Sequence, residues 1–520
     1  MKLADLIQAL TARGLACALA GPAEAEIAGI TPDSRRVGPG MLFAAMKGVA
    51  ADGHDYLRQA AEAQAAALLV ERPDPAIESV PQLKVADSRL ALAYAADELA
   101  GRPTAGMTLV GVTGTNGKTT TSYLVEAALS ASGPVGVIGT VEVRYGQVRR
   151  AADMTTPEPV ALAALFGQMR AAGVAQAVME VSSHALDQRR ADGCLFDVGV
   201  FTNLSRDHLD YHRDLASYFA AKRRLFADLL PAARAAGKRP AAVICLDDQH
   251  AEELAALCLG LGLTVLTYGL TPAAQVHLED EELTIAGSAC RVVWPGGGFA
   301  LRTPLVGEYN LQNILAAAAV GLALGREPGG IAQGIMSLQG VPGRLERVAG
   351  SAGGPAVFVD YAHTDDALTK ALGALKPLAK GRLICVFGAG GDRDHGKRPL
   401  MGLAVAKGAD LAVLTSDNPR SEKPLAIMAM VEQGLRQGGA REIERLDRAE
   451  SRSYLAEPDR AVAIALAVGQ ARQDDVVLIA GKGHEDYQIV AGVKRRFDDR
   501  EQAREALARR AGRVPEAAHV

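Results

Sequence analysis

The segment that most constrains the fold of this chain is residues 111–120, which read Gly-Val-Thr-Gly-Thr-Asn-Gly-Lys-Thr-Thr. The apolar residues around its start predict a buried strand, and Lys118-Thr119-Thr120 is placed to open a helix. Glycines allow backbone N–H groups to turn toward phosphate oxygens, and the first turn of a helix adds partial positive charge. The order of strand, glycine-rich loop, lysine and helix therefore predicts an α/β domain that binds the phosphates of a nucleotide.

The loop departs at one position from the strict phosphate-binding pattern, which requires glycine five residues before Gly117. This chain has Val112 at that position. The strand, the glycine-rich loop, the Lys-Thr-Thr run and the helix still follow one another in the expected order. A glycine-rich turn that binds no phosphate would not require this order. We therefore predict that Lys118 contacts the β- and γ-phosphates of ATP and that Thr119 contacts Mg²⁺.

The rest of the chain has an α/β pattern, since short apolar runs alternate with alanine-rich helical segments. For 520 residues, a size of roughly 150 residues per domain predicts three or four domains. A helix is expected over 311–324, and a charged, solvated helix over 494–510. Strands are predicted at 41–46, 66–70, 107–112, 135–139, 175–181, 198–203, 242–246, 264–268, 356–361, 383–387, 411–415 and 476–480, with alternating short strands over 276–306.

Overall charge and composition argue against several classes of protein. A formal net charge of −4, from 56 basic and 60 acidic residues, argues against a general nucleic-acid-binding protein. The N-terminus has no apolar signal-peptide core, and the longest apolar stretch, 314–325, is too short to span a bilayer. The six cysteines are scattered without a Cys-x-x-Cys pair, which indicates buried thiols in a reducing compartment. We therefore expect a cytoplasmic protein without a membrane span or a nucleic-acid partner.

Several side chains of the middle region are candidates for metal binding. Glu180 ends an apolar strand, where a carboxylate either holds Mg²⁺ or is simply solvated. His208 and His212 are four residues apart, but the glutamate of a zinc-protease motif is absent between them. His208 could help to hold a hard cation or orient phosphate, although a hydrogen-bonded structural histidine is commoner. By pattern alone, Lys222 lies in a basic helical turn typical of a solvated face.

Polar or glycine-rich loops follow four predicted strands of the C-terminal region, at 360–363, 388–398, 415–420 and 481–485. Open α/β sheets bind ligands at the carboxyl ends of their strands. Arg393 and Arg420, together with Glu485, would suit a zwitterion, because guanidinium pairs with carboxylate and carboxylate pairs with ammonium. The alternative is that these loops are only solvated.

Taken together, the motifs resemble those of the Mur ligases and their folylpolyglutamate synthetase relatives. Segments that match the family in order are 114–120, 155–157, 180–184, 203–210, 307–313 and 343–346, so the resemblance spans nearly the whole chain. Asp417-Asn418-Pro419-Arg420 resembles the signature of members that add meso-2,6-diaminopimelate, whereas lysine-adding members usually lack that arginine. The resemblance implies ATP-dependent addition of meso-diaminopimelate to the D-Glu γ-carboxylate of UDP-N-acetylmuramoyl-L-alanyl-D-glutamate, through an acyl phosphate, in peptidoglycan precursor synthesis.

The resemblance implies an α/β fold of three domains: an N-terminal UDP-binding domain at 1–105, a central P-loop ATPase domain at 106–342 and a C-terminal Rossmann-like domain at 343–520. We expect a monomer. Asp365 is a departure, since relatives often have proline there, beside the ATP-side loop.

The resemblance also implies the roles of individual residues, with Lys118, Lys222, His208 and Glu180 as the catalytic ones. ATP would contact Gly114, Thr115, Asn116, Gly117, Lys118, Thr119, Thr120, Asn310, Asn313, Arg344 and Asp360. The UDP-sugar peptide would contact Ser34, Thr155, Thr156, Ser182, Gln188 and Arg190. Diaminopimelate would contact Arg393, Asp417, Asn418, Pro419, Arg420, Gly481 and Glu485. Mg²⁺ would be held by Thr119, Glu180, His208 and a carbamylated Lys222.

Two kinds of alternative remain open. The first is a sibling enzyme: a lysine-adding ligase, another Mur ligase or a folylpolyglutamate-type ligase. Arg420 discriminates among these, because it offers a partner for the extra carboxylate of diaminopimelate. The second is a P-loop switch or a non-catalytic nucleotide-binding module. That class needs no amino-acid site, so the loops at 392–398, 417–420 and 481–485 weigh against it.

Overall fold

The computed structural model describes residues 1–48, 51–350, 354–446 and 451–512. The chain forms two compact units. The first comprises Met1–His277 and Leu315–Gly334, and the second comprises Leu278–Ile314 and Ile335–Val520. The domain boundaries expected near residues 105 and 342 remain predictions.

The first unit begins with a five-stranded sheet in the order β1-β5-β4-β3-β2, which is parallel except for β1. Its helix α1 buries leucines at positions 3, 6 and 10, a spacing that places them on one face of a helix. The strands predicted at 41–46 and 66–70 are confirmed. The elements are α1 (Leu3–Ala12), β1 (Ala18–Ala20), β2 (Gly29–Thr31), η1 (Ser34–Arg36), β3 (Met41–Ala44), η2 (Gly53–Tyr56), α2 (Leu57–Glu62), β4 (Ala67–Val70), β5 (Gln82–Lys84), α3 (Ser88–Leu99) and η3 (Pro103–Gly106).

An eight-stranded sheet follows in the order β13-β12-β11-β6-β10-β7-β8-β9. All six strands predicted here are confirmed, and they pair in parallel. Because β6 lies between β10 and β11, its carboxyl end is a switch point, where such sheets bind ligands. The strands are β6 (Thr108–Thr113), β7 (Val135–Ile138), β8 (Glu142–Tyr145), β9 (Val148–Ala151), β10 (Gln176–Glu180), β11 (Val198–Phe201), β12 (Ala241–Cys245) and β13 (Thr264–Tyr268).

The hairpin β8–β9 was not predicted, because its outer strand β9 is exposed and carries two arginines instead of an apolar run. The helices of this region connect the strands of the sheet. They are α4 (Lys118–Leu129), η4 (Ser130–Ser132), α5 (Pro159–Ala171), α6 (Ser183–Asp187), α7 (Leu209–His212), α8 (Leu215–Arg224), the π-helical turn η5 (Leu225–Leu229), α9 (Leu230–Ala235) and α10 (Ala251–Gly260).

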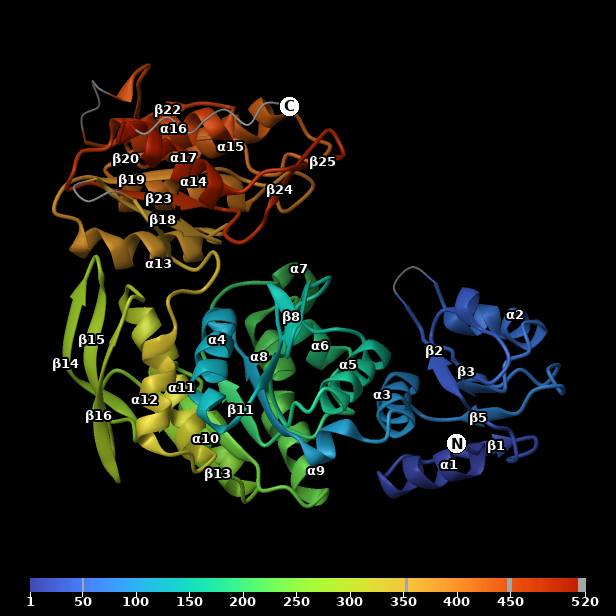
Figure 1. Cartoon of the computed structure of the whole chain (residues 1–520). Helices are drawn as coiled ribbons and strands as arrows, with labels where there is room; N and C mark the ends of the chain where they lie inside the picture. Colours follow the sequence, from blue (N-terminus) through green and yellow to red (C-terminus); the bar gives the residue numbers. More distant parts are fainter. Residues whose placement is uncertain (49–50, 351–353, 447–450, 513–520) are drawn as a thin grey trace. The chain divides into compact units, whose positions relative to one another are not determined.

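The second unit contains a seven-stranded sheet in the order β17-β18-β23-β19-β20-β22-β21 (Figure 1). It is parallel except at β17, and alternate residues of its buried strands enter two cores. One core contains residues of α13, α14 and α15, and the other contains residues of α16 and α17 (Asp499–Arg510), as in a doubly wound sheet. The elements are β17 (Glu346–Val348), β18 (Ala356–Asp360), α13 (Asp365–Leu375), η6 (Lys376–Leu378), β19 (Leu383–Phe387), α14 (Lys397–Gly408), β20 (Leu411–Leu414), α15 (Pro424–Gln437), β21 (Arg441–Glu442), β22 (Ser453–Ala456), α16 (Arg460–Gln470) and β23 (Val476–Ala480).

Two small sheets and two further helices complete the chain. The alternating strands predicted over 276–306 form a three-stranded sheet, and the helix predicted over 311–324 is α11. Within the described ranges, no helix is long and apolar enough to cross a membrane. All six cysteines are free. The elements are β14 (His277–Thr284), β15 (Gly287–Trp294), β16 (Gly297–Thr303), α11 (Glu308–Ala323), α12 (Pro328–Ser337), β24 (Tyr487–Val490) and β25 (Val493–Arg496).

The solvated helix predicted over 494–510 is partly wrong. Its first residues belong to β25, and the helix α17 begins at Asp499 and ends at Arg510. Asp499 is fully buried, and its carboxylate pairs with both Nε and Nη2 of Arg460 at 2.7 and 2.6 Å. The charged pattern did not reveal this pair, because its partner lies on another helix.

The Arg460–Asp499 pair supports a prediction about stability. Arg460→Met is expected to lower the free energy of unfolding by about 3 kcal/mol, because it leaves a buried carboxylate unpaired. The control is Arg496→Ala, which removes an exposed pair between Arg496 and Glu501 of α17 and should change stability far less, because water and salt screen such a pair. Urea denaturation measures both, and equal losses would contradict the prediction.

Candidate active site

The glycine-rich loop leaves the carboxyl end of β6 and enters α4, as predicted. Gly117 has a left-handed φ of 86° and caps α4, so the first N–H groups of that helix point out of its end. Gly114 has a φ of 153°, and a Cβ atom there would lie 1.8 Å from the Thr202 hydroxyl oxygen. Only glycine fits at Gly114 without displacing the neighbouring segment.

The segment after β11 supports this loop. The Asn116 N–H donates to Oδ1 of Asn203 at 3.0 Å, and the Thr202 hydroxyl donates to the Asn116 carbonyl at 2.7 Å. The Thr115 N–H donates to the Asn203 carbonyl at 2.8 Å, and the Thr115 hydroxyl lies 3.2 Å from that of Tyr218. Thr202 and Tyr218 were not predicted as site residues, because nothing in the sequence around them indicates that they face the loop.

Lys118 and Lys222 converge on one backbone oxygen of the loop. Both ammonium groups donate to the Gly114 carbonyl at 2.8 Å. Lys222 comes from α8 and is 1% exposed, and its Nζ lies 4.3 Å from the centroid of the Tyr218 ring. Burial, and then the nearby Lys118 charge, lower the pKa of Lys222 well below its usual range. The solvated face indicated by pattern alone is therefore wrong for Lys222.

Glu180 ends β10 and connects the loop to the next strands. Its Oε2 accepts from the Thr119 hydroxyl at 3.1 Å and from the Thr140 hydroxyl at 2.8 Å, and its Oε1 accepts from the Thr140 N–H at 3.0 Å. The Thr140 hydroxyl also lies 3.0 Å from that of Thr155. Glu180 is 1% exposed, so the alternative of a solvated carboxylate is wrong. Thr140 was missed, because one threonine in a turn forms no pattern.

The residues expected to hold the sugar peptide continue this network. The Thr156 hydroxyl donates to the Glu180 carbonyl at 2.9 Å, and the Ser182 N–H donates to the Thr156 hydroxyl at 3.0 Å. Arg190 donates to the Thr156 carbonyl at 3.1 Å and to Oε1 of Gln188 at 2.6 Å. The structure therefore brings these side chains together at the carboxyl end of β10.

Ser34 belongs to a different part of the first unit. It lies half-buried in the turn η1 after β2, where the Asp33 side chain accepts the Arg35 N–H at 3.1 Å. Within the part of the chain that the structure describes, no hydrogen bond joins Ser34 to the Glu180 network.

His208 and His212 have different environments. His208 has a φ of 53°, and its side chain is 45% exposed, with its ring centroid 4.9 Å from that of His184. Partial burial, together with nearby positive charges, lowers the pKa of His208 to about 4. His212 is buried, and its Nε2 lies 3.0 Å from the Ser183 hydroxyl. His212 is therefore a hydrogen-bonded structural histidine, whereas His208 offers an accessible neutral imidazole.

The oxygen donors around Glu180 fit a magnesium ion. Mg²⁺ prefers oxygen ligands and commonly combines one or two carboxylates with phosphate oxygens and water. Glu180 and Thr119 supply such oxygens, whereas the ammonium form of Lys222 cannot be a ligand. Among the described residues, no group of three or more His, Cys, Asp or Glu side chains gathers as a metal-binding set. The donors therefore suit a cation held jointly with phosphate.

In the second unit, Arg344 and Asp360 lie at the carboxyl end of β18. The Asp360 carboxylate accepts the Leu345 N–H at 2.7 Å and the Ala362 N–H at 2.8 Å. The guanidinium carbon of Arg344 lies 4.7 Å from the centroid of the Tyr361 ring. Burial raises the pKa of Asp360, and the Arg344 charge opposes this shift.

Asn310 and Asn313 are buried in the first turns of α11. The Asn310 amide donates to the Val306 carbonyl at 2.8 Å, and the Asn313 amide donates to Oδ1 of Asn310 at 3.2 Å. Their orientation is therefore fixed by contacts at the start of the helix.

Asp365 occupies the first position of α13, and the Thr364 hydroxyl caps this helix. Proline and aspartate are both favoured in the first turn, proline for its fixed φ and aspartate for its charge. The departure from the family pattern therefore leaves the start of α13 regular.

The loops after β19 and β20 are in direct contact. Arg420 has a φ of 54°, its Nη1 donates to the Gly391 carbonyl at 2.7 Å, and its N–H donates to the Ile489 carbonyl at 3.0 Å. A Cβ atom at Gly391 would lie 1.9 Å from the Pro419 carbonyl oxygen, so glycine is required there. Arg393 is exposed on the same loop.

Acidic and amide groups come from the loop that carries Arg420 and from the loop after β23. The Asn418 amide donates to Oε2 of Glu485 at 2.8 Å. Gly481 has a φ of 118°, and a Cβ atom there would lie 3.1 Å from Oδ2 of Asp417. Lys482, which was not predicted as a site residue, donates to Oδ1 of Asn418 at 3.1 Å. The loops after β20 and β23 therefore place carboxylates and an amide at one edge of the sheet, where they suit an ammonium group.

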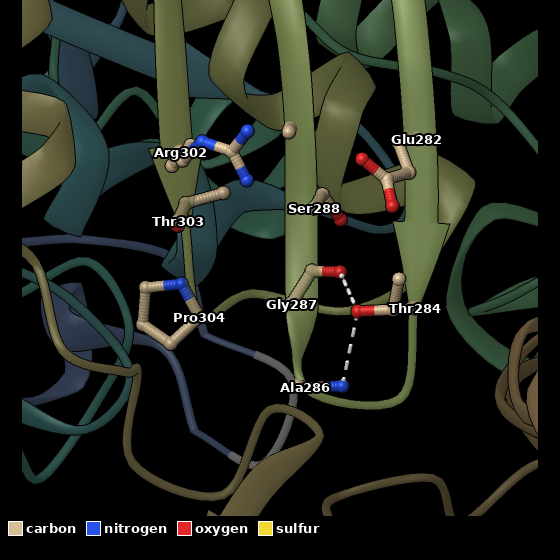
Figure 2. A pocket seen from close by; sticks show the side chains of 9 residues that line it. Glu282, Thr284, Ala286, Gly287, Ser288, Arg302, Thr303 and Pro304 are labelled. Atoms are coloured by element: carbon tan, nitrogen blue, oxygen red, sulfur yellow. Dashed lines mark hydrogen bonds between the residues drawn. The ribbon is translucent and has the colours of Figure 1, made fainter.

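A groove of about 360 Å³ lies on the three-stranded sheet, and none of the predicted site residues lines it (Figure 2). Figure 2 shows Glu282 and Arg302 on its two sides, and both are exposed. The Thr284 hydroxyl donates to the Gly287 carbonyl at 2.9 Å and accepts the Ala286 N–H at 3.3 Å. These polar groups are thus used within the hairpin turn.

Comparisons with known proteins match most of the chain. The model of the Mur ligase family catalytic domain matches residues 26–98, that of the Mur ligase middle domain matches 112–321, and that of the Mur ligase glutamate ligase domain matches 343–483. The chain is 48% identical over 486 residues to the UDP-N-acetylmuramoyl-L-alanyl-D-glutamate–2,6-diaminopimelate ligase of Geobacter metallireducens, covering 93% of this chain and 94% of that relative.

Solved structures give the same result for the fold. The structure of a UDP-N-acetylmuramoyl-L-alanyl-D-glutamate–2,6-diaminopimelate ligase has a TM-score of 0.69 and 33% identity, covering 93% of this chain and 95% of that one. The MurF ligase from Thermotoga maritima in complex with ADP has a TM-score of 0.59 and 19% identity, covering 94% of this chain and 98% of that one, and it shares the fold.

Proposed function

This chain belongs to the Mur ligase family, and on that premise we propose that it joins 2,6-diaminopimelate to UDP-N-acetylmuramoyl-L-alanyl-D-glutamate, using ATP, in peptidoglycan precursor synthesis. It is an ATP-dependent acid–amino-acid ligase. The observation that carries the choice of amino acid is that Arg420 lies on the same loop as Asn418, whose amide donates to Glu485. Together these loops offer partners for both a carboxylate and an ammonium group.

The chemistry explains why the chain carries lysines at a phosphate site. A carboxylate is a poor acyl donor, so an oxygen of the D-Glu γ-carboxylate first attacks the γ-phosphorus of ATP, and ADP leaves. The amine of diaminopimelate then attacks the acyl carbon, phosphate leaves, and the amine proton passes to solvent. Lys118 stabilises the negative charge that accumulates on the transferring phosphoryl oxygens.

We propose that Mg²⁺ is held by Thr119, Glu180 and His208 together with a carbamate on Lys222. Bound there, the metal would supply Lewis-acid stabilisation of the phosphoryl oxygens. Carbamylation would convert Lys222 from a cation into an anionic oxygen ligand, the type that Mg²⁺ prefers. The burial of Lys222 against Tyr218 without a carboxylate partner supports this role among the described residues.

We further propose that the substrate is the meso isomer of diaminopimelate. We also propose that the protein is a monomer in the cytoplasm. The residues around Glu180, with Ser34, would bind the UDP-sugar peptide, and four further side chains would contact the nucleotide. The proposed sugar-peptide contacts are Ser34, Thr155, Thr156, Ser182, Gln188 and Arg190, and the proposed nucleotide contacts of the second unit are Asn310, Asn313, Arg344 and Asp360.

The proposed specificity is tested by ADP release in the presence of the UDP-muramoyl dipeptide and a panel of amino acids. Release is expected to depend on meso-diaminopimelate and to be weak with L-lysine, because lysine lacks the carboxylate that would pair with Arg420. Reactions without dipeptide are the control for ATP hydrolysis alone. Release that depends on lysine instead would contradict the proposed specificity and favour the lysine-adding alternative.

A further inference from the structure

Lys482 is the most deeply buried charged group of the amino-acid site. Its side chain is 0% exposed, and its ammonium lies within reach of three residues of that site. Nζ is 3.1 Å from Oδ1 of Asn418, 3.4 Å from Oε2 of Glu485 and 3.6 Å from Oδ1 of Asp417. A buried ammonium is costly unless its hydrogen bonds are used, so these contacts fix where it lies.

The Asn418 amide has one orientation because of these contacts. Its Oδ1 accepts from Lys482 and from the Ile489 N–H at 3.0 Å, and its Nδ2 donates to Glu485 at 2.8 Å. Two donors therefore face the oxygen and one carboxylate faces the nitrogen. Rotating the amide by half a turn would place N–H groups against both donors. Lys482 thus helps to keep the Asn418 amide directed at Glu485.

Lys482 also compensates the charge of two neighbouring carboxylates. Oδ1 of Asp417 is buried and has no hydrogen-bond partner among the described residues, so Lys482 is its nearest source of positive charge at 3.6 Å. Burial raises the pKa of Glu485, and Lys482 opposes this shift. Lys482 therefore offsets part of the negative charge that these two carboxylates carry when they are ionised.

We propose that Lys482 is a positioning residue of the amino-acid site, whose buried ammonium holds Asn418 and Glu485 in the arrangement that receives the ammonium group of the incoming amino acid. The inference rests on the proposed function. Lys482 acts through these neighbours, since its own ammonium would repel that of the ligand. Its removal should therefore weaken amino-acid binding and leave the binding of ATP and of the UDP-muramoyl dipeptide unchanged.

The test measures three KM values for wild type, Lys482→Met and Lys482→Arg, each with the other two substrates saturating. Lys482→Met is expected to raise the KM for diaminopimelate at least about tenfold. The KM values for ATP and for the dipeptide should stay within about twofold. Lys482→Arg, which keeps the charge, should recover part of the loss. Lys482→Gln, which keeps an N–H donor, replaces the methionine variant if the latter does not fold.

A matched control separates this role from the general cost of losing a buried lysine. The Lys238 side chain is only 9% exposed, and its Nζ lies 2.6 Å from Oδ2 of Asp197 at the amino end of the other large sheet. Lys238→Met is expected to lower the thermal midpoint without changing the KM for diaminopimelate.

The outcomes distinguish this inference from the proposed function. An unchanged KM for diaminopimelate in folded Lys482→Met, or an equal rise in all three KM values, would overturn the inference alone. A wild-type protein that releases no ADP with diaminopimelate would overturn the proposed function.

Discussion

The Lys222→Ala variant is expected to remain folded and to lose about 10³-fold in kcat. In the wild-type protein, Lys222 is 1% exposed, and its ammonium and that of Lys118 both donate to the Gly114 carbonyl. A cation placed there only for stability would be a poor choice, because burial and the neighbouring lysine both disfavour its charge. The same features favour a neutral amine, which is the form that reacts with CO₂ to give a carbamate.

The measurement is ADP release at saturating substrates, with circular dichroism to show that the variant is folded. Arg223→Ala is the matched control, since the Arg223 side chain lies next along α8, is 39% exposed and is 3.8 Å from Glu253. This control should keep turnover within about twofold of wild type. Wild-type activity is also expected to fall in CO₂-depleted buffer and to return with bicarbonate. Near-normal turnover of Lys222→Ala would exclude the metal role.

The strands and their loops were predictable because their signals are local. Each predicted strand is a short apolar run followed by glycine or a polar residue, and the structure confirms them from residue 41 to residue 480. Thr119 and Glu180 were each predicted to contact Mg²⁺, and their side chains are in contact although the two residues are 61 positions apart. A strand and the loop after it specify where a side chain emerges, and parallel pairing brings such ends to one edge of the sheet.

What the sequence could not show is burial that depends on distant elements. Lys222 stands in the run Lys222-Arg223-Arg224, and only the packing of α8 against the loop after β6 buries the first of these three cations. Lys482 lies between two residues that were assigned to the amino-acid site, yet its contacts with Asn418 depend on the pairing of β23 with the rest of the sheet. Charged residues look alike in a sequence, whether they face water or a buried partner.

The Arg420→Asn variant is expected to lower kcat/KM for meso-diaminopimelate by about 10³-fold and to affect L-lysine far less. Asparagine tolerates the left-handed φ of 54° at this position better than alanine does, so the loss can be assigned to the guanidinium. The guanidinium is already oriented by the Gly391 carbonyl at 2.7 Å, which leaves its other N–H groups for a carboxylate. Removing it would leave the second carboxylate of diaminopimelate without a partner.

The comparison of two amino acids makes this a test of specificity. If Arg420 pairs with the carboxylate that lysine lacks, the ratio of kcat/KM values for the two amino acids must fall, because only one of them loses an ion pair. Arg420→Lys should give an intermediate ratio, since an ammonium keeps the charge but not the fork of donors. Equal losses with both amino acids would mean that Arg420 shapes the loop for any ligand. The preference for diaminopimelate would then have to come from another cation of the site, such as Arg393.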